Sequence, residues 1–180
     1  RKDGLIAINL EDGDELVKVA LTDGKQELLL VTAYGMAIRF SEEEVRPIGR
    51  TGQGVHGIKL EKGDYVQAMD LVRADSQVLV ITENGYGKRT KIDEYRAQSR
   101  GGKGIQTIKE SKRNGNIADM LILKDGEEIL AVTTEGIIIR LQVADISTSG
   151  RATMGVLLMR LGENDKVIAM AKVINDNNVQ

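Results

Sequence analysis

Basic side chains recur along this sequence at spacings of 50 and 51 residues, and their chemistry indicates what the chain could bind. Arg and Lys donate charge-assisted hydrogen bonds, and phosphate oxygens are among their preferred acceptors. Radial repetition would place equivalent residues along one rim, so the spacing predicts a basic track. The alternative interpretation is solvated strand ends or ion pairs with nearby acidic segments. The recurring positions form three registers: Arg39, Arg89 and Arg140; Arg50, Arg100 and Arg151; and Lys59, Lys109 and Arg160.

The densest group of cations lies in residues 85–113. This segment holds nine Lys and Arg residues against Asp93, Glu94 and Glu110, so it carries +6 while the whole chain carries −2. Within it, Arg100-Gly-Gly-Lys-Gly104 combines cations with backbone that can approach a phosphate closely. Aromatic residues are few, which disfavours base stacking on single strands, and no long amphipathic helix is present to enter a major groove. These features predict binding to duplex phosphates with little sequence preference.

Other kinds of site find little support. The chain has no Cys and one His, which excludes thiolate chemistry, Cys-based metal sites and a His-based triad. Residues 101–104 lack the positions of a P-loop, and residues 11–15 lack the spacing of an EF-hand. We therefore expect no catalytic residue, no metal and no cofactor. The lack of Cys fits a reducing cytoplasm, and the longest apolar run, residues 28–38, is too short to span a membrane, so we expect a cytoplasmic protein without a membrane partner.

Short β-strands must position the cations, because the sequence repeats a hairpin pattern. Each of the segments 27–39, 77–89 and 128–140 runs from an aliphatic strand through a turn glycine into a second strand. A short acidic segment follows, which we expect to form one turn of helix, and then a Gly-rich loop. Two further strands, such as 55–60 and 65–72, are expected to close the unit. Four strands per repeat is the blade of a radial β-architecture.

The repeat predicts the fold class and the boundaries. In the second strand, alternation places Met36, Ile38 and Phe40 on a packed face and Arg39 on the opposite face. We predict an all-β, propeller-like array of four-stranded blades, with about three and a half repeats of roughly 50 residues. Such an array leaves strand edges exposed, so we expect an open arc or pairing between copies. The predicted units are a partial repeat at 1–25 and repeats at 26–76, 77–127 and 128–180.

Several motifs occur in a distinctive order: Gly35-Met-Ala-Ile-Arg-Phe40, Glu44-Val-Arg-Pro47, residues 54–60, Glu83-Asn-Gly-Tyr-Gly-Lys-Arg-Thr90, Glu94-Tyr-Arg96, Gly101-Gly-Lys-Gly104 and Lys112-Arg-Asn-Gly115. In these motifs the chain resembles the C-terminal domain of the DNA gyrase A protein, over essentially its whole length. The related domain of topoisomerase IV has more degenerate blades, and the regularity of the repeats here favours gyrase.

The resemblance implies a β-pinwheel, which is a six-bladed, propeller-like disc whose neighbouring blades exchange strands. It implies a non-catalytic module that wraps duplex DNA around a basic perimeter and supports ATP-dependent negative supercoiling by the holoenzyme. The implied partners are double-stranded DNA, the rest of the gyrase A protein and the gyrase B protein, with the catalytic residues elsewhere. The family's essential box reads Gln-Arg-Arg-Gly-Gly-Lys/Arg-Gly, and Gln98–Gly104 resembles a degenerate counterpart in which Ser99 replaces an arginine.

We expect the DNA contacts to come from basic residues at the hairpin ends and in the Gly-rich loops. Two alternatives stay open: a protein-interaction scaffold of the propeller type, and the equivalent domain of topoisomerase IV. Salt-sensitive binding to plain duplex DNA would separate the scaffold from a DNA-binding module. The expected DNA-binding residues are Arg39, Arg46, Arg50, Lys59, Lys88, Arg89, Arg96, Arg100, Lys103, Lys109, Arg140, Arg151 and Arg160.

Overall fold

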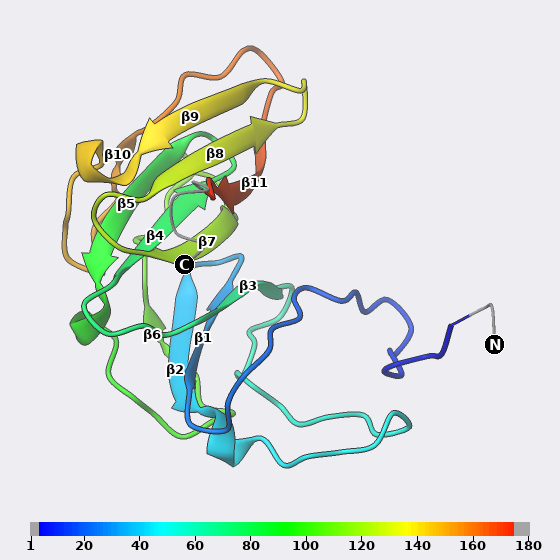
Figure 1. The fold of residues 1–180 in the computed structure, drawn as a ribbon. Helices are drawn as coiled ribbons and strands as arrows, with labels where there is room; N and C mark the ends of the chain where they lie inside the picture. The colour runs from blue at the N-terminus through cyan, green and yellow to red at the C-terminus, as the bar shows by residue number, and fades with distance from the viewer. Residues whose placement is uncertain (1–3, 175–180) are drawn as a thin grey trace.

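The computed structural model describes residues 4–174, in which three antiparallel sheets stack as successive blades (Figure 1). The first blade contains β1 (Glu27–Thr32), β2 (Met36–Ser41) and β3 (Val66–Leu71). The second contains β4 (Gln77–Thr82), β5 (Tyr86–Lys91) and β7 (Ile117–Leu123). The third contains β8 (Glu128–Thr133), β9 (Ile138–Gln142) and β11 (Val167–Lys172). The prediction of an all-β array of blades is confirmed.

Each blade is built around one of the predicted hairpins. The turn glycines Gly35, Gly85 and Gly136 all have a positive φ, which glycine adopts at no steric cost. Each hairpin then continues into a single turn of 3₁₀ helix, as expected for the acidic segments. These turns are η1 (Glu42–Glu44), η2 (Ile92–Glu94) and η3 (Val143–Asp145).

The fourth strand of a blade comes from the following repeat. Strand β6 (Ile105–Gln106) pairs with β2 of the first blade, and β10 (Val156–Leu157) pairs with β5 of the second. The expectation that each repeat closes its own blade is therefore wrong, and the exchange of strands implied by the resemblance is confirmed. Residues 55–60, which were expected to form a strand, form none. Among the described residues the third sheet has only three strands, in the order β11-β8-β9.

Both faces of a blade are buried, because the blades stack face to face. Leu29 of the first blade belongs to the same buried cluster as Val78 and Ile122 of the second. Leu79 of the second blade belongs to another cluster with Ile129 of the third. The hydrophobic core therefore lies between the sheets, and each sheet contributes apolar side chains on both sides. No helix in residues 4–174 is long and apolar enough to cross a membrane.

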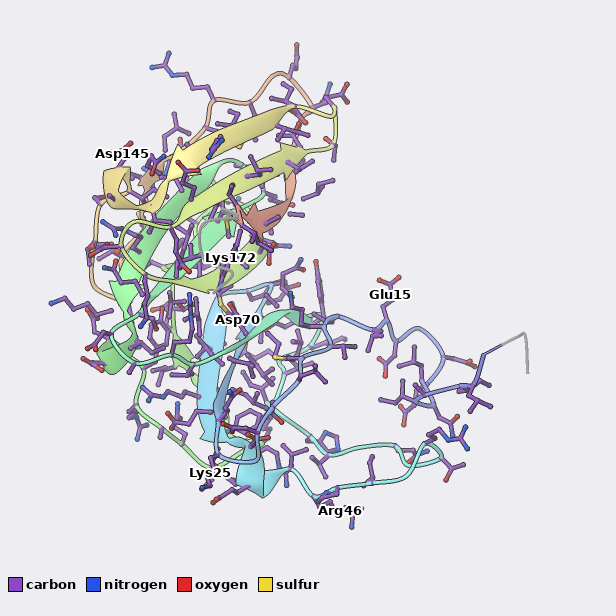
Figure 2. The ribbon with its side chains drawn as sticks, in the orientation of Figure 1. Glu15, Lys25, Arg46, Asp70, Asp145 and Lys172 are labelled. Atoms are coloured by element: carbon purple, nitrogen blue, oxygen red, sulfur yellow. The ribbon has the colours of Figure 1, made fainter. Side chains whose placement is uncertain are left out.

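The strands β3, β7 and β11 form the edge of the stack opposite the exchanged strands, and polar contacts join them. The Asp70 carboxylate on β3 accepts a hydrogen bond from the Ile122 N–H on β7 at 2.8 Å. Asp119 on β7 accepts from the Met170 N–H on β11 at 2.7 Å, and burial raises the pKa of this carboxyl. Lys172 on β11 lies 3.8 Å from Asp70, so this edge links the first blade to the third (Figure 2).

The glycine that precedes each exchanged strand is expected to be sensitive to substitution. Gly155 has φ +72, and a Cβ at this position would lie 2.5 Å from Gly87 O. Gly54 has φ +82, but no atom lies within 4 Å of the place where its own Cβ would be. We therefore expect Gly155→Ala to lower the free energy of unfolding by about 3 kcal/mol, and the matched control Gly54→Ala by about 1 kcal/mol, since only the first adds a collision to the backbone strain. Urea unfolding measures both, and equal losses would contradict the prediction.

Candidate nucleic-acid interface

Two loops cover the outer edges of the first and second blades. Residues 95–104 cross the first blade, where Arg39 O accepts a hydrogen bond from the Gln98 N–H at 2.8 Å. Residues 146–155 cross the second blade in the same way. Each loop belongs to the repeat after the blade that it covers. As a result, loop residues rather than hairpin residues form the outer surface of these two blades.

Arg100 and Arg151 are held alike at this outer surface. The Arg100 Nη1 donates to His56 O at 2.5 Å, and the Arg151 Nη1 donates to Gln106 O at 2.8 Å. Both side chains belong to partly exposed residues, and within residues 4–174 the Nη2 group of neither makes a hydrogen bond. Each guanidinium is thus oriented by a backbone carbonyl and keeps N–H donors for an acceptor such as a phosphate.

Two acidic residues, to which the sequence analysis assigned no role, position these arginines. Glu44 Oε2 accepts from the Arg100 N–H at 2.9 Å, and Glu94 Oε2 accepts from the Arg151 N–H at 3.1 Å. Their 50-residue separation, with Asp145 51 residues further on, was a usable signal. The acidic segments are thus anchors for the basic loops as well as turns of helix.

Lysines from consecutive repeats meet beside these arginines. The Lys59 N–H donates to Gly102 O at 2.8 Å, next to Lys103 in the sequence. Lys59 and Lys103 also line one small hollow of about 80 Å³, together with Glu61 and Asp64. Both lysines are exposed. The two acids offset part of their charge, so the pair is a local cation site rather than an uninterrupted positive surface.

The next repeat makes the same backbone contact between a lysine and the following loop. The Lys109 N–H donates to Thr153 O at 2.9 Å, which brings this exposed lysine beside the loop that carries Arg151. The strand exchange therefore places a lysine of one repeat beside the basic loop of the next at both junctions, although Met154 stands in the second loop where Lys103 stands in the first. Arg46 projects from the loop after η1 (Figure 2). The expected residues that are exposed are Arg46, Arg50, Lys59, Arg96, Lys103, Lys109, Arg140 and Arg160.

The first register of arginines does not form the expected rim, because two of its members lie between blades. Arg89 has 9% of its side chain exposed; its Nε donates to Ile146 O and its Nη1 to Asp125 Oδ1, both at 2.5 Å. Arg39, with a side chain 20% exposed, bonds Glu27 and two carbonyls of the second repeat, those of Ile92 and Tyr95. The expectation that these guanidinium groups lie on a free face is wrong, since that face packs on the following blade.

Arg140 is the third member of this register, and no further blade covers it in the described structure. Its guanidinium bonds Glu128, and its side chain is 57% exposed. The hydrogen bond from Arg140 lowers the pKa of the Glu128 carboxyl. Arg39 makes the same pair with Glu27 in its own hairpin, with a side chain only 20% exposed. The hairpin therefore pairs the arginine with an acid, and stacking of the next blade adds burial.

Lys88 is another expected DNA-binding residue that the structure places in the interior. The residue has no exposed surface, and its Nζ donates to Gly150 O at 2.5 Å and to Arg151 O. Burial lowers the pKa of Lys88 to about 8; the nearby Glu94 raises it and Arg151 lowers it further. Its ammonium holds the 146–155 loop on the second blade, so it supports the outer surface from beneath.

The lowered pKa of Lys88 predicts a pH dependence of stability. Between pH 8 and 10.5 the unfolded chain binds a proton that the folded chain has lost, so folding becomes more favourable as the pH rises through this window. Relative to Lys88→Met, the wild-type chain is expected to gain on the order of 3 kcal/mol across it. Urea unfolding of both proteins at several pH values measures the difference. A difference that stays constant with pH would contradict the prediction.

Comparison with known proteins identifies relatives over the whole chain. A family model described as the DNA gyrase C-terminal domain, beta-propeller, matches residues 1–23, 26–73, 76–124 and 127–174. The DNA gyrase A protein of Clostridium acetobutylicum is 49% identical over 180 residues, which is all of this chain and 22% of that protein. The DNA gyrase A protein of Halalkalibacterium halodurans is 60% identical over 173 residues, or 96% of this chain and 21% of that protein. The chain thus spans about a fifth of the length of these relatives.

Solved structures agree in fold. A DNA gyrase A C-terminal domain superposes with a TM-score of 0.90 at 29% identity, covering 96% of this chain and 59% of that one. The C-terminal domain of a DNA topoisomerase IV superposes with a TM-score of 0.88 at 35% identity, covering 93% and 52%. With the repeated blades, the exchanged strands and the fourfold family match, these likenesses show that the chain belongs to the DNA gyrase C-terminal domain family.

Proposed function

We propose that this chain is a DNA-binding and DNA-wrapping module of the DNA gyrase A protein. In this proposal it holds duplex DNA by phosphates along the outer edge of the blades, without contributing catalytic residues. The observation that carries the proposal is the placement of cations at the junctions between repeats, where Lys59 lies beside Lys103 and Lys109 lies beside the loop that carries Arg151. A surface that repeats its cations from blade to blade suits a ligand whose charge also repeats.

The secondary structure supports a proposal of phosphate contacts rather than base readout. The helices in residues 4–174 are single 3₁₀ turns, which are too short to lie along a major groove. The outer surface consists of loops that carry Arg and Lys, together with two-residue strands. Contacts of this kind fix the path of a duplex but carry little sequence information.

In the holoenzyme, the proposed role is to wrap DNA for ATP-dependent negative supercoiling. The partners would be double-stranded DNA, the remainder of the gyrase A protein and the gyrase B protein, in the cytoplasm. The exposed candidates for phosphate contact are the exposed cations described above, to which the partly exposed Arg100 and Arg151 are added. Arg39, Lys88 and Arg89 are assigned to the support of that surface, because their donors are occupied inside the stack.

The experiment that tests this function separates wrapping from simple binding. A nicked circular duplex is ligated in the presence of increasing amounts of the chain, and the linking number of the closed product is measured. Wrapping predicts a progressive change in linking number, together with equal binding of unrelated duplex sequences. An unchanged linking number together with salt-sensitive binding would mean that the chain binds duplex DNA but does not wrap it. Failure to bind duplex DNA at low salt would favour a protein-interaction scaffold, and ATP hydrolysis by this chain alone would contradict the non-catalytic assignment.

A further inference from the structure

The second junction between repeats lacks one cation that the first junction has. Lys103 precedes the exchanged strand β6, and it lines a small hollow together with Met36, the first residue of β2. Before the exchanged strand β10, Met154 stands in the place of Lys103. This second junction lies between two described blades, so its contacts with both neighbours are seen. The question is whether another residue supplies the missing charge.

Arg113 lies at the corresponding place of the second junction. Its guanidinium lies over the ring of Tyr86, with Cζ 4.4 Å from the ring centroid. Tyr86 is the first residue of β5, as Met36 is of β2, and it pairs with Leu157 of the exchanged strand. Arg113 therefore covers β5 at the point where the 146–155 loop enters β10. The cation has moved from the loop that crosses the blade to the loop that precedes β7.

The loop 109–116 holds Arg113 in this position through its backbone and its side chain. The Asn84 Nδ2 in the hairpin turn donates to Arg113 O at 2.9 Å. The Arg113 Nε donates to Asn114 Oδ1 at 3.0 Å, and the Asn114 Nδ2 donates to Met154 O at 2.6 Å. Asn114 is buried, with 1% of its surface exposed. One buried amide thus ties the arginine to the residue that replaces Lys103.

Arg113 keeps donors for a ligand and has no counter-charge of its own. Among the described residues, its Nη1 and Nη2 groups make no hydrogen bond and no carboxylate forms an ion pair with it. The residue is exposed. Its loop has three cations against one acid, whereas the counterpart loop 59–65 has two cations against two acids. Arg113 is therefore an oriented and uncompensated guanidinium, which suits a phosphate oxygen.

We propose that Arg113 contacts a phosphate of duplex DNA at the second junction, in the role that Lys103 has at the first, and that Tyr86 positions it. This inference rests on the proposed function. A guanidinium can offer a phosphate two parallel N–H donors, and stacking on Tyr86 reduces the side-chain entropy that is lost when it binds. The second junction thus keeps its cation, but on a different loop and with a different side chain.

Replacement of Arg113 by glutamine tests the contact. At about 0.1 M salt, Arg113→Gln is expected to weaken binding to a labelled random-sequence duplex roughly eightfold and to reduce the slope of log K against log salt by about 0.9. Lys112→Gln is the matched control, because Lys112 is an exposed cation of the same loop that, among the described residues, has no stacking partner. Its loss is expected to change the affinity less than about twofold, since an unoriented side chain gains little on binding.

Met154→Lys tests whether residues 113 and 154 serve the same phosphate. In the Arg113→Gln chain, this second substitution is expected to restore most of the lost affinity. In the wild-type chain it is expected to raise the affinity less than about twofold, because Arg113 already occupies the place. Equal gains in the two backgrounds would overturn the shared place and, with it, the exchange of Lys103 for Arg113.

Two substitutions of Tyr86 test the positioning role. Tyr86→Phe keeps the ring and is expected to leave the affinity unchanged. Tyr86→Leu removes the ring while the charge of Arg113 stays, and it is expected to weaken binding by about two- to fivefold, the size of a partly exposed cation–π contact. Equal affinities of these two variants would contradict the positioning role. Far-UV circular dichroism and urea unfolding confirm that each variant is folded.

The outcomes separate this inference from the function on which it rests. If the wild-type chain binds duplex DNA and Lys103→Gln weakens it, but Arg113→Gln does not, the inference is overturned while the proposed function stands. Equal weakening by Arg113→Gln and Lys112→Gln would also overturn it, because the charge of the loop and not the oriented arginine would then determine binding. A wild-type chain that does not bind duplex DNA at low salt would overturn both.

Discussion

Replacement of Lys59, Lys103 and Lys109 together by glutamine is expected to weaken binding to random-sequence duplex DNA by a factor on the order of 100 to 1,000 at about 0.1 M salt. Each cation that neutralises a phosphate releases counterions, and at that salt concentration each contact contributes roughly a factor of eight. All three side chains are exposed, so the substitutions remove charge without opening the core. Fluorescence anisotropy with a labelled duplex measures the affinity.

The matched control is Lys124→Gln. Lys124 is exposed in the turn that leaves β7, the strand at the opposite edge of its sheet from β10. Its loss is expected to change the affinity less than twofold. Each of Lys59, Lys103 and Lys109 is also replaced singly by glutamine. If Lys124→Gln lowered the affinity as much as one of these single replacements, net charge, and not the junctions between repeats, would determine binding. Such a result would contradict the assignment of the outer edge.

Replacement of Arg89 by alanine is expected to lower the free energy of unfolding by about 3 kcal/mol. The Arg89 Nε and Nη2 groups donate to Ile146 O and Ala144 O, and both acceptors lose their donors when the guanidinium is removed. The substitution also leaves a gap between the second and third blades, since the residue is 7% exposed. Urea unfolding followed by circular dichroism measures the loss.

Arg140→Ala is the control in the same register. Its side chain bonds Glu128 at an exposed site, so the urea midpoint is expected to stay nearly unchanged. If Arg89→Ala also left the urea midpoint nearly unchanged but lowered the affinity for DNA, the structural role assigned to Arg89 would be wrong and Arg89 would be a DNA-binding residue. A large loss of stability, with DNA binding preserved below the unfolding transition, is the result that supports a structural role.

The sequence was sufficient to predict the hairpins, their turn glycines and the helical turns after them, because these depend on local chemistry. Gly35 and Gly85 occur where a tight turn needs a positive φ, and alternation marks the flanking strands. The strand exchange was not deducible from the residues alone. Ile105 and Gln106 have the same composition whether they pair within their own repeat or with the preceding blade, and only tertiary packing decides between these possibilities.

The same limitation explains the errors at the candidate interface. Alternation correctly separated the two faces of β2, but it could not reveal that the second face packs on another blade and encloses Arg39. Lys88 occupies the place of the apolar Ile38 in the hairpin register, and this break in the pattern was a signal of burial that charge counting concealed. By contrast, the loop cations could be placed from the sequence, because glycines and polar residues surround them.

The most direct test of the central claim is the salt dependence of binding by the whole chain to random-sequence duplexes, with long and short duplexes compared. Contact with phosphates along several blades predicts a slope of log K against log salt of about −3 or steeper, at roughly 0.9 per phosphate, and tighter binding to the longer duplex. A slope near zero, or no binding at low salt, would contradict a DNA-binding outer edge and would leave this arc of blades as a scaffold.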